Sequence, residues 1–340
     1  MVNITGKVIR ILPFKEVNIG DEAKKVVDLL IADESDYKRV SFWDEKAELV
    51  LRGEIIAGNV LRIENAHVPE ESKEGSEKRA NAGKYTKIRK ISANIPTLSR
   101  ANSLDLTVLA VARPEHGLVC IAGIDGNGDW IRPQGVYEND IFTTNMPKFK
   151  NLCISKIYVD EWRGGRPRKE DRFFVYGESV KRELNEEEKR EFLERNVDNS
   201  VDVVFKGGRS LGLIKPRILH VYEERVKGTK KKEGKNHEQY IRFNFKDPSG
   251  RIYRRWSCRC SAFYKTWNEL KKKHRWTYGL RMLQYLKKNN IYLAIGLTYS
   301  DYGVDRLEYG AYPMIVGVHV VEKPFFRKKS FTKRTYLFFF

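Results

Sequence analysis

The stretch at residues 26–52, VVDLLIADESDYKRVSFWDEKAELVLR, contains two β-patterned runs followed by a short helical run. Residues 26–32 and 38–43 are rich in β-branched, aliphatic and aromatic side chains, as strands are. Residues 45–52 have the spacing of charged and apolar residues that is typical of a helix. Asp44 precedes them and is a suitable N-cap, because its carboxylate can accept hydrogen bonds from the free amides of the first turn. The stretch therefore predicts a strand, a second strand and a helix.

Three further β-patterned runs flank this stretch, at residues 4–12, 60–63 and 85–91. The predicted order is three strands, a short helix and two strands. This is the plan of the OB fold, a small five-stranded barrel that binds oligonucleotides across its second and third strands. We therefore expect an OB-fold barrel at the N-terminal end of the sequence.

Three segments of this region carry a family resemblance: TGKVIRI (5–11), VVDLLIADES (26–35) and VSFWDEKAELV (40–50). They resemble the OB folds of archaeal single-stranded DNA-binding proteins of the replication protein A family. The resemblance covers residues 1–92. It implies that the chain binds single-stranded DNA by stacking bases and contacting phosphates, with Phe14 as the aromatic residue at the mouth of the first loop.

Positive charge is concentrated in the C-terminal two thirds of the chain. Lysine and arginine total 64 against 45 acidic residues, which gives a formal charge of +19. Residues 1–103 carry 18 basic and 16 acidic side chains, so residues 104–340 carry a net charge of +17. Residues 93–103 (ANIPTLSRANS) are small and polar and include a proline, as linkers do. The charge excess predicts a polyanionic partner.

The basic portion repeats the order of strands, helix and strands. A charged helix is predicted at 185–196 and a long basic helix at 262–288, and the strand runs lie at 106–112, 118–124, 130–133, 152–159, 172–176, 215–225, 240–245, 252–256, 292–298 and 313–321. On the long helix, apolar side chains fall near one face and lysines and arginines on the other.

Residues 118–133 (LVCIAGIDGNGDWIRP), 292–300 (YLAIGLTYS) and 313–321 (PMIVGVHVV) resemble the dual OB-containing domain of prokaryotic proteins. The resemblance spans residues 104–322 and implies two OB-like modules. The expected fold class is mainly β with α insertions, with three tandem OB-fold barrels, the last containing the long basic helix. The expected domains are residues 1–92, 104–214 and 215–322, followed by a basic aromatic tail at 323–340.

Within the first predicted barrel, the candidate nucleic-acid contacts lie on the third strand and in the loops. Val40 and Phe42 share one strand face, and Arg39, Ser41 and Trp43 share the other, which we expect to be the binding platform. Packing of Trp43 against the following helix is the alternative. The full set of candidates in this barrel is Phe14, Lys15, Arg39, Trp43 and Lys84, with Lys78 and Arg79 as further phosphate contacts.

Two clusters in the basic portion interleave aromatic rings with guanidinium groups, which suits base stacking combined with phosphate pairing. Core aromatics and solvated arginines are the alternatives for both clusters. The first cluster is Trp162, Arg163, Arg166 and Arg168, and the second is Tyr240, Arg242, Tyr253, Arg254, Arg255 and Trp256.

The tail at residues 323–340 has six basic residues, no acidic residue and a terminal aromatic cluster. Tyr336, Phe339 and Phe340 have the spacing of sliding-clamp-binding peptides, although Lys333 stands where such peptides begin with glutamine. Docking of these apolar residues onto the protein's own surface is the alternative, because they would otherwise promote association in water.

The sequence therefore predicts a non-enzymatic protein that binds single-stranded nucleic acid. The family resemblance implies that this nucleic acid is DNA and that the protein acts in replication, repair or recombination. RNA binding, a nucleic-acid-processing enzyme and an adaptor for repair or defence proteins are the alternatives. We find no catalytic motif, no metal-ligand spacing and no cofactor motif. The absence of a signal-like start predicts a cytoplasmic protein, and the presence of only three glutamines among many charged residues favours a thermophilic source.

Overall fold

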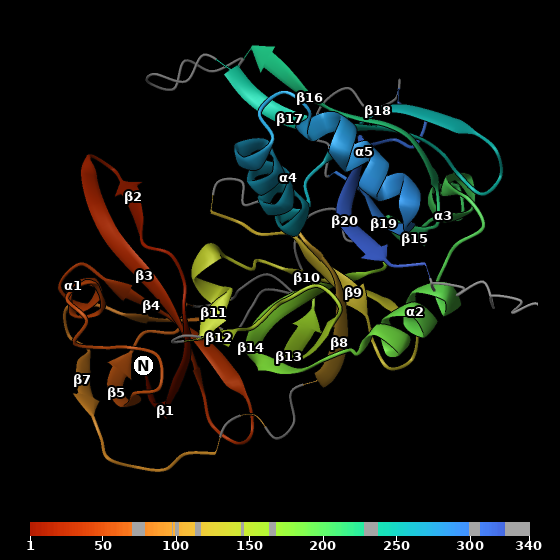
Figure 1. The fold of residues 1–340 in the computed structure, drawn as a ribbon. Coiled ribbons are helices and arrows are strands. Elements are labelled where there is room, and N and C mark those ends of the chain that lie inside the picture. Colours follow the sequence, from red (N-terminus) through yellow and green to blue (C-terminus); the bar gives the residue numbers. More distant parts are fainter. Residues whose placement is uncertain are drawn as a thin grey trace, which may run out of the picture.

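Three β-rich units follow one another along the chain in the computed structural model (Figure 1). The structure describes residues 1–69, 79–96, 98, 102–112, 117–143, 146–162, 168–227, 237–298 and 307–323. Strands dominate all three units and helices are inserted between them, so the protein is mainly β, as the sequence predicts.

The first unit is a sheet with the strand order β6-β4-β3-β1-β5-β7, and β2 pairs with β3 beside it. Its elements are β1 (Val2–Ile11), β2 (Lys15–Ile19), β3 (Glu22–Ala32), β4 (Tyr37–Trp43), α1 (Glu45–Leu51), β5 (Val60–Ala66), β6 (Arg79–Ala82) and β7 (Lys87–Lys90). Strand β6 pairs with β4 in parallel, and β7 pairs with β5 in antiparallel orientation. Because β6 and β7 are consecutive, one interrupted strand joins the two ends of the sheet.

The second unit is a closed barrel with the order β10-β14-β13-β8-β9, in which only β10 and β14 are parallel. Its strands are β8 (Asn102–Val111), β9 (Ile121–Ile124), β10 (Trp130–Gln134), β13 (Cys153–Glu161) and β14 (Asp171–Glu183). Between β10 and β13 lie the 3-10 helix η1 (Glu138–Asp140) and the short strands β11 (Phe142–Thr143) and β12 (Met146–Pro147).

The third unit is a sheet with the order β15-β19-β20-β18-β17-β16. Its elements are β15 (Leu211–Ile214), β16 (Arg217–Lys227), β17 (His237–Lys246), β18 (Ile252–Cys258), α4 (Ser261–Lys273), α5 (Tyr278–Lys288), β19 (Asn290–Leu297) and β20 (Pro313–Val321), preceded by α2 (Glu186–Arg195) and α3 (Val201–Phe205). Strand β15 pairs with β19 and β16 pairs with β17. Pro216 separates β15 from β16, because proline cannot donate a ladder hydrogen bond.

The three units share one connectivity. Counting five strands in each, strand one pairs with strands two and four, and strand three pairs in parallel with strand five. The fifth strand of the first unit is interrupted, and so is the first strand of the third unit. In the first and third units, helices join strand three to strand four, as the sequence predicts.

The predicted long helix at residues 262–288 is wrong in one respect: it is two helices, α4 and α5, which lie side by side. A straight helix of that length would extend about 40 Å, which is longer than a sheet of six strands spaced about 4.8 Å apart is wide. The break at residues 274–277 folds α5 back, so that Met282 and Leu286 join Phe263 and Trp267 in the core of the third unit.

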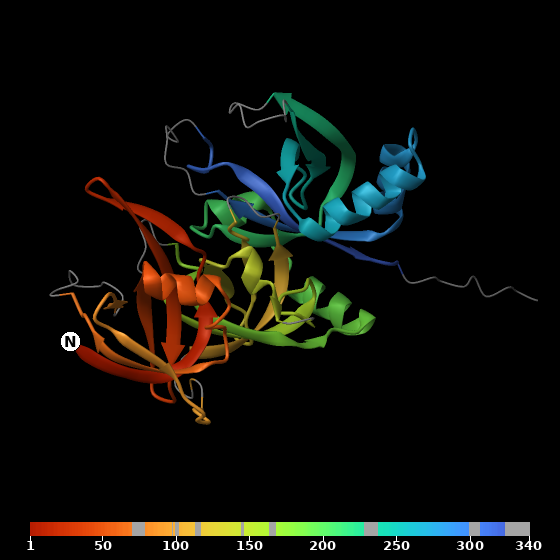
Figure 2. The same cartoon turned by 90° about the vertical axis from the view of Figure 1, so that its left-hand side faces the viewer.

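Two local predictions in the first unit also need correction. Asp44 lies at the N-cap of α1 but makes no capping hydrogen bond, and its carboxylate instead accepts from the backbone amide of Lys25 at 3.1 Å. Strands β2 and β6 were not predicted. They lie in polar sequence, and pairing with β3 and β4 stabilises them rather than a hydrophobic pattern of their own. In Figures 1 and 2 the ribbon of β2 and β3 projects from the first unit.

The expected unit boundaries differ slightly from the sheets. The predicted linker at 93–103 overlaps the start of β8 at Asn102, and Leu98 within it packs against the first and second units. The expected boundary after residue 214 separates β15 from β16, although β15 belongs to the third sheet.

Strand β3 is buried on both of its faces. Val27, Leu29 and Ile31 point into the core of the first unit. Leu30 and Ala32 lie on the opposite face and pack against Tyr158, Val175 and Leu98. The nearly continuous apolar run of the strand fits this arrangement, since a strand with one exposed face alternates with polar residues. The outer face of β3 is therefore an interface between the first two units.

A buried arginine crosses this interface. Arg10 on β1 donates from Nε to Asp140 Oδ1 at 2.8 Å and from Nη2 to Asp140 Oδ2 at 2.6 Å. It also donates to the carbonyl oxygens of Phe174 and Gly135. The side chains of Arg10 and Asp140 are only 3% and 4% exposed. The carboxylate and two carbonyl oxygens of the second unit thus compensate the cost of burying the charge of Arg10.

Close backbone approach fixes the second unit to the third. A Cβ atom added to Gly317 of β20 would lie 2.0 Å from the carbonyl oxygen of Leu109 on β8, so only glycine fits there. Two residues further on, His319 Nε2 donates to the same oxygen at 3.0 Å. Burial lowers the pKa of His319 to about 4, so the ring is neutral at physiological pH. One apolar cluster spans both units, with Leu109 packed beside Leu211, Tyr292 and Val316.

In the described part of the chain, no helix has the length and apolar character that crossing a membrane requires. The four cysteines are free thiols.

We predict that Arg10→Met lowers the free energy of unfolding by about 3–5 kcal/mol, because Asp140 is left buried without a partner. Urea denaturation measures this loss. The control is Lys181→Met, which removes an exposed ion pair with Asp105 (Nζ to Oδ2, 2.7 Å) and should cost less than about 1 kcal/mol. Equal effects of the two substitutions would contradict the role assigned to Arg10.

Candidate nucleic-acid interface

A β-bulge on β18 determines which side chains face outward in the third unit. Phe243 of β17 pairs with Trp256, but Phe245 pairs with Tyr253, so Asn244 opposes two residues, Arg254 and Arg255. Arg255 has a φ of 59°, and its backbone amide donates to Asn244 Oδ1 at 2.8 Å. A bulge of this kind inserts one extra residue and redirects the side chains that follow.

Because of the bulge, Arg254 and Arg255 face outward, whereas Tyr253 and Trp256 face inward. In a regular strand, successive side chains alternate between faces, and the two arginines would point in opposite directions. Here both arginines are exposed, whereas Tyr253 and Trp256 are 6% and 7% exposed. Both rings pack against Phe245, with ring centroids 5.3 and 5.2 Å apart. The rings of Tyr253 and Trp256 therefore belong to the core and are not free to stack on bases.

The outward side chains border a groove of about 370 Å³ between β17, β18 and the start of β20. Its lining residues are Arg242, Arg254, Arg255, Trp256, Ser257, Tyr312, Pro313 and Met314. Four of these were predicted from the sequence. Tyr312, which is 61% exposed, was missed because it lies about 55 residues further along the chain. Pairing of β18 with β20 brings it to the groove.

One carboxylate holds two of the three arginines. Glu224 on β16 accepts from Arg242 Nε at 2.7 Å and from Arg255 Nη2 at 2.6 Å. Burial would raise the pKa of Glu224, but the hydrogen bond from Arg242 and the charges of both arginines lower it. Among the described residues, Arg254 makes no ion pair. The groove therefore has a net positive charge.

A row of aromatic side chains continues along the same outer face. The ladder places Tyr222 opposite Arg242 and Glu224 opposite Tyr240. The guanidinium carbon of Arg242 lies 5.1 Å from the centre of the Tyr240 ring, and the rings of His220 and Tyr222 are 5.2 Å apart. His220 and Tyr222 were not predicted, although the alternation of residues 217–225 marks them as outward-facing. Rings and guanidinium groups thus lie together on this face.

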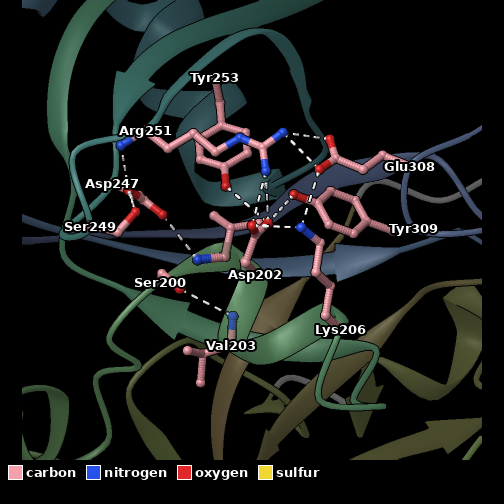
Figure 3. A network of polar contacts seen from close by, with 11 residues as sticks. Ser200, Asp202, Val203, Lys206, Asp247, Ser249, Arg251, Tyr253, Glu308 and Tyr309 are labelled. Atoms are coloured by element: carbon pink, nitrogen blue, oxygen red, sulfur yellow. Dashed lines mark hydrogen bonds and ion pairs between the residues drawn. The ribbon is translucent and has the colours of Figure 1, made fainter.

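A polar network fixes the segment that carries Tyr312 (Figure 3). Tyr309 donates to Asp202 Oδ1 at 2.7 Å, and Arg251 Nη1 lies 3.0 Å from Asp202 Oδ2. The other arm of Arg251 binds Glu308 at 2.7 Å, and Lys206 Nζ binds Asp202 at 2.8 Å. The network connects α3, the turn between β17 and β18, and residues 307–312. Tyr312 is therefore held on an anchored segment.

The network changes the acidity of its members. Hydrogen bonds from Lys206 and Tyr309 lower the pKa of Asp202 to about 2. Burial and the hydrogen bond to Asp202 raise the pKa of Tyr309. Asp202 is therefore ionised and Tyr309 protonated over the whole physiological range of pH.

The predicted platform of the first unit is mostly closed. Val40 and Phe42 are buried in the core, as predicted. On the opposite face, Arg39 Nη2 binds Asp28 Oδ2 at 2.5 Å, and Ser41 donates to Asp28 Oδ1 at 2.6 Å. The pKa of Asp28 is lowered, because the hydrogen bonds from Arg39 and Ser41 outweigh the effect of burial. Arg39 therefore has an internal partner rather than a phosphate.

The other predicted residues of the first unit lie at the ends of strands or in the loops between them. Phe14 is exposed between β1 and β2, and Lys15 Nζ is 4.0 Å from Asp28 Oδ2. Trp43 is half-buried and donates from Nε1 to Asn81 Oδ1 at 3.1 Å. Lys84 is exposed beside the ring of Tyr85, which was not predicted. The ladder aligns Lys15 with Val26 and Val26 with Trp43.

In the second unit, Arg168 has a structural partner. Its guanidinium donates to the carbonyl oxygens of Leu297, at 2.7 Å, and of Thr298, which ties the second unit to the third. Trp162 is half-buried, and its indole nitrogen has no hydrogen-bond partner among the described residues. Arg163, Arg166 and Lys78 lie outside the described residues, as do Tyr336, Phe339 and Phe340 of the tail. Arg79 is exposed on β6.

No cluster of three or more histidine, cysteine, aspartate or glutamate side chains suited to a metal ion occurs within the described ranges.

No family model and no curated protein matches the chain. Among solved structures, a replication factor A related protein from Methanobacterium thermoautotrophicum is 21% identical, covers 26% of this chain and 79% of its own, and has a TM-score of 0.23. A replication protein A heterotrimer bound to single-stranded DNA is 9% identical, covers 94% of this chain and 93% of its own, and has a TM-score of 0.33. A murine DNA-binding protein bound to double-stranded DNA is 12% identical, with coverages of 52% and 98% and a TM-score of 0.24. All three TM-scores lie below 0.5.

We predict that Asp202→Asn lowers the stability of the protein by about 1–2 kcal/mol at pH 7. The folded-state pKa of about 2 lies below the ordinary value of 3.8, so ionised Asp202 stabilises the fold above pH 4 and loses this effect as the pH falls toward 2. Thermal melts of both proteins should therefore differ at pH 7 and converge near pH 2. Asp129→Asn, in an exposed turn, is the control and should leave the melting temperature unchanged at either pH.

Proposed function

We propose that this protein binds single-stranded nucleic acid without strong sequence preference, and that the groove of the third unit is its principal contact. The observation that carries the proposal is the bulge on β18. It exposes two consecutive arginines beside Arg242 and Tyr312 while the neighbouring rings remain in the core.

The groove combines the two kinds of group that a single strand requires. Guanidinium groups form paired, charge-assisted hydrogen bonds with phosphate oxygens, and they do so more specifically than ammonium groups. Exposed rings such as Tyr312 can stack on any base, which is worth about 1–3 kcal/mol per base. Neither contact reads the edges of bases, so little sequence preference follows.

We also propose that all three units are OB folds. The connectivity they share supports this assignment, since strands one and four, and strands three and five, are neighbours in each unit. On this basis the units are residues 1–92, 102–210 and 211–322, with β15 assigned to the third. In an OB fold, the second and third strands form the binding face. These are β17 and β18 in the third unit, where the groove lies.

The carboxylates near the groove support binding rather than catalysis. Glu224 is held by two arginines, and Asp202 and Glu308 are held by Arg251 and Lys206. Acids that are ion-paired in this way serve to position cations. We therefore propose a non-enzymatic role.

DNA as the natural ligand, and a role in replication, repair or recombination, follow from the sequence resemblance. Clamp binding through residues 323–340, a cytoplasmic location and a thermophilic source stay predictions from the sequence.

If the proposal is right, a labelled single-stranded DNA of about 20 nucleotides binds more tightly than the duplex of the same length at equal salt. The logarithm of affinity should fall linearly with the logarithm of salt concentration, because binding releases counterions. Fluorescence anisotropy measures both properties, and an RNA of the same sequence tests the choice of DNA. Equal affinities for single strand and duplex would refute the proposal.

Two substitutions in the groove should have opposite effects. We predict that Arg254→Gln weakens binding about tenfold, because a guanidinium–phosphate contact is lost. Glu224→Gln should tighten binding severalfold, because a phosphate then no longer competes with the carboxylate for Arg242 and Arg255. Anisotropy titrations of the same single-stranded oligonucleotide compare these variants with the unaltered protein.

The matched control is Arg89→Gln, which removes one exposed arginine from β7 of the first unit. It should change the affinity far less than Arg254→Gln does. Equal losses for the two arginine variants would mean that overall charge, and not the groove, determines binding.

A further inference from the structure

The turn between α4 and α5 exposes a tryptophan. Trp276 is 95% exposed, and it lies in the four-residue turn at 274–277 that separates the two helices. Tryptophan is usually buried for most of its surface, because its large apolar ring is costly to hydrate. A ring that is almost wholly exposed on a folded segment therefore needs an explanation.

Trp276 does not hold the two helices together. That role belongs to Trp267 and Tyr278, whose rings meet edge to face with centroids 5.3 Å apart. Glu223 of β16 binds both helices, since it accepts from Trp267 Nε1 at 3.2 Å, from Lys271 at 2.8 Å and from Tyr278 at 3.4 Å. The hairpin of α4 and α5 is thus bound to β16 of the third sheet (Figure 1). Trp276 lies at its turn.

The surface of the hairpin is strongly basic. Its only acidic residue is Glu269, and Lys271 is used by Glu223. Seven other cations are exposed and make no ion pair within the described part of the chain: Lys265, Lys272, Lys273, Arg275, Arg281, Lys287 and Lys288. Two of these, Lys273 and Arg275, are within three residues of Trp276. Uncompensated cations around an exposed ring are complementary to a polyanion that carries flat groups.

The hairpin surface is separate from the groove. Glu223 and Glu224 are consecutive residues of β16, and consecutive strand residues point to opposite faces. Glu223 contacts the hairpin, whereas Glu224 contacts Arg242 and Arg255 of the groove. The two basic surfaces therefore lie on opposite sides of one strand.

We propose that the turn of the α4–α5 hairpin is a second contact for the same nucleic-acid strand, beyond the groove. Trp276 stacks on a base, and the neighbouring cations hold the adjoining phosphates. This inference rests on the proposed function.

A nucleic acid fits the hairpin better than an anionic membrane does. A helix that lies on a membrane buries one apolar face in the lipid. The apolar faces of α4 and α5 are already used, since Phe263, Trp267, Met282 and Leu286 are buried in the core. Besides Trp276, only Leu280 and Tyr285 are large exposed apolar residues of the hairpin.

Oligonucleotides of two lengths test the inference on the full-length protein. A strand of about 5 nucleotides matches the lower range of one OB fold, whereas about 30 nucleotides exceed that range. Trp276→Ala should weaken binding of the long strand roughly tenfold and leave the short strand unchanged. Because Trp276 is exposed, its variant should melt at the same temperature as the unaltered protein.

A charge variant provides the second measurement. Lys272→Gln, Arg275→Gln and Arg281→Gln together should reduce the salt slope for the long strand by about 2, at about 0.7 per phosphate contact. The matched control replaces three exposed cations of β7, Lys87→Gln, Arg89→Gln and Lys90→Gln, and should leave the slope unchanged.

The outcomes separate the inference from the proposed function. If the unaltered protein binds both strands but the hairpin variants behave like it on the long strand, only the inference is overturned. If the unaltered protein binds neither strand, the proposed function fails and the inference fails with it. Binding to phosphatidylserine vesicles that Trp276→Ala abolishes, with binding of the long strand unchanged, would assign the hairpin to membranes and overturn the inference.

Discussion

The buried ion pair of Arg10 with Asp140 decides how the first unit meets the second, and hence which surfaces of the protein remain open. A buried charge is tolerated only where its partner and its remaining hydrogen bonds are in place. Asp140 and two carbonyl oxygens of the second unit supply these to Arg10. The contact that results covers Leu30 and Ala32 on the outer face of β3. The strand face that alternation predicts as the binding platform is therefore partly covered by the second unit, at Leu30 opposite Arg39.

In the third unit, β17 and β18 border an exposed groove. Its groove is built from residues that are far apart in sequence, and each part has its own support. Glu224 holds two of the arginines, and the Asp202 network holds the segment that carries Tyr312. Glu223 plays the same role for the α4–α5 hairpin, because its carboxylate accepts hydrogen bonds from Trp267 and Lys271. Single carboxylates thus position basic and aromatic groups on both sides of β16.

Much of the fold could be predicted from periodicity, since most strands of all three units follow the alternation of apolar residues. The cluster at residues 240–256 was predicted as a nucleic-acid contact, and two of its rings, Tyr253 and Trp256, lie in the core, which was the alternative. Alternation assumes a regular strand, whereas the bulge at Arg255 moves Trp256 into the core. The sequence predicts Arg168 as a phosphate contact. Its actual partners, the carbonyl oxygens of Leu297 and Thr298, lie about 130 residues further along the chain, where a local pattern cannot reveal them. The break between α4 and α5 depends on the size of the core of the third unit. A helical pattern in the sequence contains no information about that size.

The sequence by itself determined the mainly β class, the position of most strands and the location of the positive charge. These properties depend on neighbouring residues or on composition. Apolar residues repeat every two residues in strands and every three to four in helices, so the sequence shows both. Only the tertiary structure decided which arginines are exposed, which rings are core, and which barrel face is covered. Those properties depend on pairing and packing between distant segments, as when β20 brings Tyr312 to Arg254 or when Asp140 receives Arg10. Local sequence carries no record of such partners.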